Sequence, residues 1–226
     1  LVLRPGLLPD VHYINQGRHA LLATNDGWIL RLDLKNGRQD IATKLNAVVT
    51  STATSTNIRG SDNLLAVASV TPGSLTILNT NLEIQKTIPV FDRTGRVASG
   101  LLRVRSAPAR NSFVTLLSDV PELWEISYDP KAPEIGLGMV HDFQYREGHF
   151  VPGYLNPKRV TLPTLAHDFV LSDSGHEVLT VHSQAIASST DIDVNLTHLD
   201  VRKTETAAAP RLSPDASDPM SLIVDA

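Results

Sequence analysis

Three segments of the chain share one order of positions: a turn, then apolar residues that alternate with others, then a polar stop. They are Gly27–Asp33 (GWILRLD), Gly73–Asn79 (GSLTILN) and Pro121–Ser127 (PELWEIS), and they begin 46 and 48 residues apart. Alternation with a period of two places successive side chains on opposite faces of an extended chain. Each segment is therefore predicted to be a β-strand.

Companion strands surround each copy. Another short apolar strand precedes each copy, and a third follows the first two copies. A fourth copy follows an insertion between Tyr128 and Val160. The preceding strands are predicted at His19–Thr24, Leu64–Ser69 and Ser112–Leu117, the following ones near Ile41–Leu45 and Ile84–Val90, and those of the fourth copy at Glu177–His182 and Val194–Asp200.

The connections are Asp-Gly, Asn-Gly and Pro-Gly turns, which favour antiparallel hairpins. A repeat near 45 residues is typical of propeller blades, whereas solenoid repeats are usually shorter or helical. The prediction is an all-β fold, a β-propeller with about four blades; a solenoid or a β-sandwich are the alternatives. We assign residues 1–202 to the propeller. Residues 203–226, rich in Ala, Pro, Ser and Asp, are assigned to a disordered or irregular tail.

Composition excludes several classes of function but does not identify one. The net charge of −4 and the pI near 6.0 give no basic surface for nucleic acid, and no apolar run reaches the roughly 18 residues of a membrane span. The absence of Cys excludes disulfides, a Cys nucleophile and the Cys-x-x-Cys-His attachment of a c-type haem. Because the chain starts at Leu1 without a signal peptide, we expect a mature product or a fragment.

Candidate ligand-binding residues lie between the predicted strands. His12 stands alone in PDVHYI, where a loop can present it at one end of the ring. A lone surface histidine is the simpler interpretation, but a haem iron needs only one protein imidazole on a side. Arg59 precedes the second blade, and connections before the third carry Arg103, Arg105 and Arg110. Their guanidinium groups suit ligand carboxylates, although each could be an ordinary solvated loop charge.

The insertion is longer than an ordinary connection and is rich in ionisable side chains, as binding loops often are. A metal site at His141, Asp142 and His149 lacks a third imidazole, and no Ser lies in a nucleophile-elbow motif. The side chains of the adjacent pair His167 and Asp168 would point to opposite faces of a strand. The insertion's candidates are His141, Asp142, Tyr145, Arg146, His149, Tyr154, Lys158 and Arg159.

Over residues 9–202 the sequence resembles the d1-haem propeller family, which includes cytochrome cd1 nitrite reductase and its biosynthetic relatives. The likeness is strongest in VHYINQGRHALLATNDGWILRLDL, in NIRGSDNLLAVAS with SLTILNTNLEIQKTIPV, and in APARNSFVTLLSDVPELWEISYDP with the following GLGMVHDFQYREG. Within the family it looks most like the dihydro-haem d1 dehydrogenase. The resemblance implies that the four blades belong to a larger, eight-bladed ring.

The resemblance also implies roles for residues. His12 matches the histidine that ligates the d1 iron in the nitrite reductase, and Arg59 matches an arginine near the macrocycle's carboxylates. Arg103 and His167 are the other candidates for the cofactor site. Asn25 and Gly100 stand where the family has arginines. The family's later-blade Pro-His-x-Gly motif and its c-type haem domain have no counterpart in this chain.

The implied function is a d1-haem-binding oxidoreductase domain, acting on dihydro-haem d1 in haem d1 biosynthesis for denitrification, or on nitrite. Haem d1, or dihydro-haem d1 as substrate, is the implied ligand, and a c-type haem would belong to a domain outside this chain. The nitrite reductase or another haem d1 biosynthesis protein is an implied partner, and the periplasm is the implied location. A non-catalytic d1-haem carrier and a haem-free scaffold are the alternatives, so catalysis itself is left open.

Overall fold

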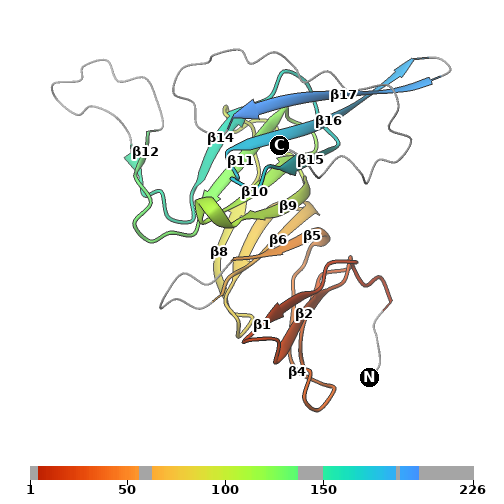
Figure 1. Cartoon of the computed structure of the whole chain (residues 1–226), viewed down its shortest axis with the longest axis vertical. Coiled ribbons are helices and arrows are strands. Elements are labelled where there is room, and N and C mark those ends of the chain that lie inside the picture. The colour runs from red at the N-terminus through yellow and green to blue at the C-terminus, as the bar shows by residue number, and fades with distance from the viewer. Residues whose placement is uncertain (1–4, 56–62, 137–149, 187–188, 199–226) are drawn as a thin grey trace.

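The computed structural model describes residues 5–55, 63–136, 150–186 and 189–198, and beyond residue 181 it describes the backbone alone. Four antiparallel sheets follow one another in chain order, and Figure 1 shows them stacked from the red sheet at one end to the blue strands at the other. The only helical element in the described part is a 3-10 turn, η1 (Pro108–Arg110). The prediction of an all-β chain is confirmed.

Each sheet is a meander in which neighbours in sequence are neighbours in space, apart from one insertion. The first sheet contains β1 (His12–Ile14), β2 (His19–Ala23), β3 (Trp28–Asp33) and β4 (Arg38–Lys44). The second contains β5 (Val48–Thr54), β6 (Leu65–Thr71), β7 (Gly73–Leu78) and β8 (Ile84–Pro89). This repeated four-stranded unit is the blade of a β-propeller.

The third sheet contains β9 (Leu101–Ala107), β10 (Ser112–Leu117), β11 (Glu122–Ser127) and β14 (Pro157–Thr161). Its last strand is separated from β11 by the insertion, whose described part forms the small hairpin of β12 (Ile135–Gly136) and β13 (Phe150–Val151). The fourth sheet contains β15 (Asp168–Leu171), β16 (Glu177–Ile186) and β17 (Ser189–His198). The insertion therefore ends where β14 begins at Pro157, slightly before the predicted Val160. The predicted tail at residues 203–226 lies outside the described residues.

Alternation along the central strands sends side chains into two different cores. On β6, Leu65 and Val67 pack toward the first sheet, whereas Ala66 and Ala68 pack toward the third. All four side chains are at most 2% exposed. A strand buried on both faces needs apolar residues at consecutive positions, which explains the run LLAVAS.

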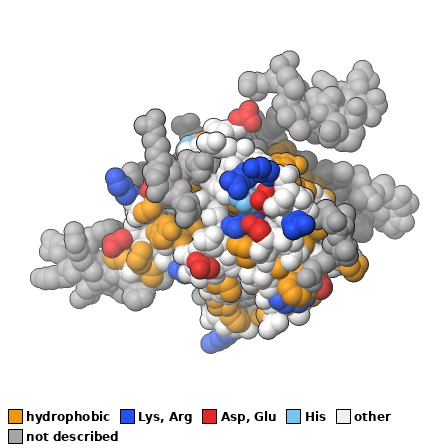
Figure 2. All heavy atoms as spheres, turned by 90° about the horizontal axis from the view of Figure 1, so that it is seen from below, with side chains coloured by type: hydrophobic (Ala, Val, Ile, Leu, Met, Phe, Trp, Pro, Cys, Tyr) orange, Lys and Arg blue, Asp and Glu red, His pale blue; other side chains and the backbone are white. Residues whose placement is uncertain are grey.

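The same division holds for the third sheet, where Phe113 on β10 faces the second sheet and Val114 faces the fourth. Phe113 contacts Tyr128 with ring centroids 4.9 Å apart, and Trp124 on β11 lies in the same core. Burying apolar surface at about 25 cal/mol per Å² makes these three cores the main source of stability. Seen along the stack from the end of the first sheet, hydrophobic and charged side chains are interspersed on the surface (Figure 2).

The turn between β2 and β3 requires glycine at one position. Gly27 has a φ of +96°, and a Cβ there would lie 2.2 Å from the carbonyl oxygen of Leu45. Its amide donates to the carbonyl of Thr24, and its own carbonyl accepts from the amide of Leu45. Gly27 thus lets the hairpin close against the segment that leads to the second sheet.

Sequence patterning did not predict the first strand of each sheet. β1, β5, β9 and β15 each form one edge of their sheet. Neighbouring first strands contact one another across the sheets, as where Thr50 on β5 donates its hydroxyl to the carbonyl of Leu101 on β9 at 2.7 Å. These four strands are the inner strands of the propeller.

Candidate functional site

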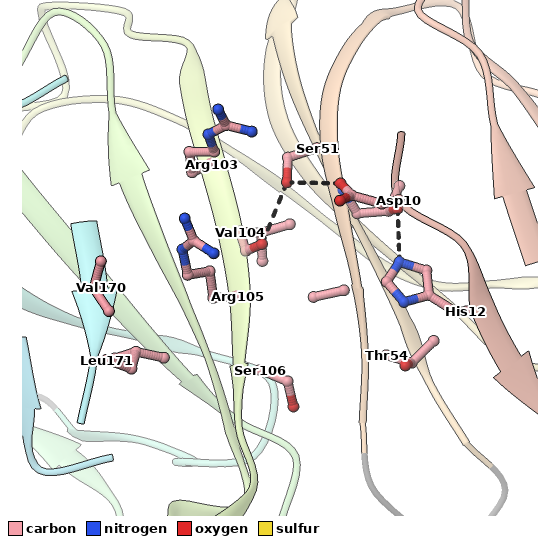
Figure 3. Close-up of a pocket in the computed structure, with 12 residues that line it drawn as sticks. Asp10, His12, Ser51, Thr54, Arg103, Val104, Arg105, Ser106, Val170 and Leu171 are labelled. Carbon is pink, nitrogen blue, oxygen red and sulfur yellow. Dashed lines mark hydrogen bonds between the residues drawn. The ribbon is translucent and has the colours of Figure 1, made fainter. Parts of the chain in front are cut away.

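A pocket of about 390 Å³ opens among the four inner strands (Figure 3). β1 contributes His12, with Asp10 just before it; β5 contributes Ser51 to Thr54; β9 contributes Arg103 to Ser106; and β15 contributes Val170 and Leu171. Its volume lies in the range of small-molecule sites, and its position at the inner edges of successive sheets is where propeller ligands gather. No single blade could form this site.

His12 is the first residue of β1 and not, as predicted, a loop residue. Its half-buried ring places Nε2 2.9 Å from the hydroxyl Oγ1 of Thr52 on β5. Burial lowers the pKa of His12 below its ordinary value, although the nearby carboxylate of Asp10 acts in the opposite direction. The lowered pKa favours the neutral imidazole, whose lone pair can bind a metal.

Asp10 occupies the same wall of the pocket as His12. Its Oδ2 lies 3.5 Å from the hydroxyl of Ser51 and 3.4 Å from the amide of Thr52. Ser51 also reaches the carbonyl oxygen of Val104, 3.3 Å away on β9. These contacts join the segment before β1 to β5 and β9, so the histidine lies at a junction of three sheets.

The opposite wall carries two cations on one strand. Arg103 and Arg105 are two positions apart on β9 and therefore project from the same face. Both lie against Asp168 at the start of β15: Arg105 Nη2 donates to Oδ1 at 3.3 Å, and Arg103 Nε lies 3.5 Å from the same oxygen. Arg105 also lies over the ring of Phe169, 5.5 Å from its centroid. The wall carries two positive charges and one negative charge.

The structure brings together two of the four residues predicted for the cofactor site, His12 and Arg103. Arg59 lies outside the described residues. His167 is exposed and does not line the pocket; its backbone amide donates to the carbonyl of Val181. Its neighbour Asp168 contacts the arginines instead, so the two side chains are separated as the strand geometry predicts.

Arg110 belongs to another part of the molecule. It makes a bidentate ion pair with Glu125 at 2.8 and 3.0 Å and contacts Nδ1 of His176 at 2.8 Å. Both side chains of the ion pair are nearly buried, which indicates a structural role.

Of the insertion's candidates, Lys158 and Arg159 lie in β14, where Arg159 stacks 4.6 Å above the ring of Trp124, and Tyr154 is exposed. His141, Asp142, Tyr145, Arg146 and His149 lie outside the described residues. Where the structure gives side-chain positions, no three His, Asp or Glu residues gather as a metal cluster. In the described part of the chain, no helix is long and apolar enough to cross a membrane.

Gly100 and Asn25, which stand where the family has arginines, lie in different surroundings. At Gly100 a Cβ would lie 2.5 Å from Cγ2 of Val70, so no larger side chain fits without a shift. Asn25 lies in the turn after β2 and lines a separate hollow with Pro5 and Trp28. The cations at the pocket come instead from positions further along β9.

Sequence reasoning did not assign Thr52, Asp10 and Asp168 to the site and placed Arg105 in a loop. The pattern LLRVRSA contains the signal for Arg105, because a strand over Leu101–Ala107 puts it on the face of Arg103. Thr52 and Asp168 have no comparable signal. Their partners are 40 and more than 60 residues away in sequence.

The fold and pocket define a class: a β-propeller with a pocket at its inner strands, lined by one histidine and two arginines of the same strand. Comparison with known families then identifies the branch. The model of the family described as "Cytochrome D1 heme domain" matches residues 10–145, more than half of the chain. The chain therefore belongs to the cytochrome d1 haem domain family.

Two relatives carry the same likeness. A dihydro-haem d1 dehydrogenase of Pseudomonas aeruginosa is 36% identical over 124 residues, which is 52% of this chain and 24% of that protein. The solved structure of the dihydro-haem d1 dehydrogenase NirN in complex with DHE matches with a TM-score of 0.66 and 27% identity, over 87% of this chain and 35% of that one. The chain thus spans between a quarter and about a third of the length of these relatives.

Proposed function

We propose that this chain binds a d1-type haem in the pocket among β1, β5, β9 and β15. The observation that carries the proposal is the meeting of His12 with Arg103 and Arg105 around one pocket, although they lie about 90 residues apart in sequence. A neutral imidazole suits an iron ligand, and guanidinium groups suit the carboxylates of a tetrapyrrole. The family match, and a relative solved in complex with DHE, support the same ligand.

The pocket fits such a group by its chemistry. Arg105 has a buried Nε without a hydrogen-bond partner, and Arg103 and Arg105 share a single carboxylate, so the wall retains capacity for an anion. His12 Nε2 lies beside the Thr52 hydroxyl, which is a weaker partner than a metal. In this proposal His12 would bind the iron, and Arg103 and Arg105 would bind the ring's carboxylates. Arg59 and His167 remain candidates for further contacts.

When bound, the haem supplies the iron and the redox chemistry. The described residues contribute binding and orientation. Thr52 fixes the direction of the imidazole, Asp10 accepts from the amide of Thr52, and Val170 and Leu171 give the fourth sheet's side of the pocket an apolar lining. For the whole protein we propose the oxidation of dihydro-haem d1 in haem d1 biosynthesis for denitrification, in the periplasm, with the nitrite reductase or another biosynthesis protein as partner.

Titration of the purified chain with haem d1, followed by absorption spectroscopy, tests the binding. We expect saturable binding with the spectrum of a histidine-ligated iron, and loss of that signature in His12→Ala. His19→Ala, on the adjacent strand β2 and outside the pocket lining, is the matched control and should keep it. An unchanged spectrum in His12→Ala would remove this residue from the site, and no binding by the wild-type chain would refute the proposal.

A second candidate function is transport of haem d1 without catalysis. The close packing at Gly100, where the family has an arginine, favours it, because one expected carboxylate contact cannot form. Incubation with dihydro-haem d1 and an electron acceptor separates the two functions. Conversion to haem d1 would support the enzyme, whereas binding without conversion by a chain extended to the full protein would support the carrier.

A further inference from the structure

We propose that Asp168 is an internal counter-ion, which a ligand carboxylate must displace from Arg103 and Arg105. The proposal deepens the proposed function, on which it rests, by assigning a residue that sets the affinity of the pocket for anions. It concerns the contact between the inner strands of the third and fourth sheets.

The arginines of this pair are less completely neutralised than Arg31 and Arg110, two largely buried arginines elsewhere in the described chain. Arg31 binds both oxygens of Asp40 at 2.9 to 3.2 Å, and Arg110 binds both oxygens of Glu125. Arg103 and Arg105, by contrast, share Oδ1 of one carboxylate at 3.5 and 3.3 Å. These separations exceed the usual length of a charge-assisted hydrogen bond.

Asp168 is not fully committed to the arginines. Its Oδ1 also accepts the backbone amide of Phe169 at 2.8 Å, the shortest of its contacts. The side chain is 38% exposed, and those of Arg103 and Arg105 are 43% and 42% exposed, so water can replace either partner. A carboxylate held mainly by its own backbone can therefore lose the arginines at small cost.

In the exchange a ligand carboxylate takes the place of Asp168 at the guanidinium groups, while the charge of Asp168 stays nearby. With Asp168 in place, the wall carries one net positive charge; a ligand carboxylate that binds the two guanidinium groups must do so against the repulsion of Asp168. An opposite or like charge about 4 Å away changes an affinity by about fivefold even in a water-like surrounding. Asp168 therefore weakens the binding of carboxylate ligands. It has little effect on the affinity for neutral ligands, because they are not repelled by its charge.

Asp168→Asn is the direct test because it removes the charge and keeps an oxygen for the amide of Phe169. The probe is metal-free coproporphyrin, whose four carboxylates need no iron ligand, and its methyl ester is the uncharged reference. Fluorescence titration at about 0.1 M salt gives both affinities. We expect Asp168→Asn to bind the acid at least about fivefold more tightly than the wild type and the ester equally well.

Asp173→Asn, in the exposed turn after β15, is the matched control for an equal change in net charge and should leave both affinities unchanged. Arg103→Ala and Arg105→Ala should weaken binding of the acid. If Asp168→Asn does not fold, as judged by its melting curve, Asp168→Ser replaces it and retains an acceptor near Phe169.

Equal binding of the acid by Asp168→Asn and the wild type would overturn the proposal. Weaker binding by Asp168→Asn would also overturn it, because it would show that Asp168 organises the arginines. Failure of all variants to prefer the acid over the ester would also overturn it, because the arginines would then bind no carboxylate. The haem d1 titration remains a separate measurement that depends on iron and His12. Failure of this proposal is therefore distinguishable from failure of the proposed function.

Discussion

His12 and Thr52 join the inner strands of the first two sheets: Nε2 of the imidazole lies 2.9 Å from the threonine hydroxyl, across 40 residues of sequence. The contact orients the ring at the pocket and engages Nε2, the ring nitrogen further from the backbone. In the proposed function this nitrogen is the one best placed to bind iron, so the hydroxyl both positions the ligand and competes for it.

Replacement of Thr52 by Val should therefore strengthen haem binding. Loss of one neutral hydrogen bond, worth about 1 kcal/mol, should lower the Kd for haem d1 by about fivefold and lower the free energy of unfolding by a similar amount. Thr52→Ser keeps the hydroxyl and serves as the control, with little change in Kd. Absorption titration measures the effect, and weaker binding by Thr52→Val would show that orientation by the hydroxyl outweighs competition.

Arg103 and Arg110 should respond in opposite ways to truncation. Arg110→Ala leaves the buried carboxylate of Glu125, whose side chain is 7% exposed, without its bidentate partner. We expect a loss of about 3 to 5 kcal/mol in unfolding free energy and, below the melting temperature, no loss of porphyrin binding.

Arg103 is half-exposed at the pocket. Arg103→Ala should therefore weaken porphyrin binding and change the free energy of unfolding by less than about 1 kcal/mol. Urea unfolding and fluorescence titration on both variants provide the comparison. Weaker binding by a folded Arg110→Ala variant would place that residue back among the ligand contacts.

The ion pair of Arg31 and Asp40 should make stability depend on pH. Hydrogen bonding from Arg31 lowers the pKa of Asp40, so the carboxylate contributes stability above the ordinary pKa near 4, and this contribution is lost as the pH falls through the lowered value. Because Asp40 is 32% exposed, we expect only about 1 kcal/mol.

Urea unfolding of the wild type and Asp40→Asn across pH 2 to 7 tests this expectation. The difference in unfolding free energy between the wild type and Asp40→Asn should be largest at pH 7. It should vanish once Asp40 is protonated in both the folded and unfolded states. Arg31 also donates to the carbonyl of Thr80 in the turn between β7 and β8. Because Asp40 holds the same guanidinium, the variant should loosen the contact between the first two blades. A difference that persists unchanged to pH 2 would assign the effect to packing.

Two glycines with similar backbones should differ in their tolerance of alanine. Gly27→Ala combines a positive φ with a Cβ only 2.2 Å from the Leu45 oxygen, whereas Gly37 has a positive φ and open space. We expect about 1 kcal/mol of destabilisation for Gly37→Ala and at least about 2 kcal/mol more for Gly27→Ala. Equal shifts in the urea midpoint would mean that the turn relaxes around the new methyl group.

The strands of the blades were predictable because they are local features. Glycine turns and apolar alternation in segments such as GWILRLD depend on neighbours a few residues away, and both survive in β3 as predicted. The inner strands were missed for the same reason. β1 is only three residues long, and β5 and β9 carry Thr, Ser and Arg at positions that face a pocket, so their sequences lack the expected apolar pattern.

By itself, the sequence determined the all-β class, the repeat and the family, since each follows from nearby residues or from likeness to a family; it also singled out His12 as a candidate ligand, which stays a prediction. Only the tertiary structure decided which polar residues share a pocket. His12 meets Thr52, and Arg105 meets Asp168, because sheet packing brings inner strands together, and the burial of apolar side chains between the sheets drives that packing. The site is polar, but hydrophobic residues elsewhere in each blade assemble it.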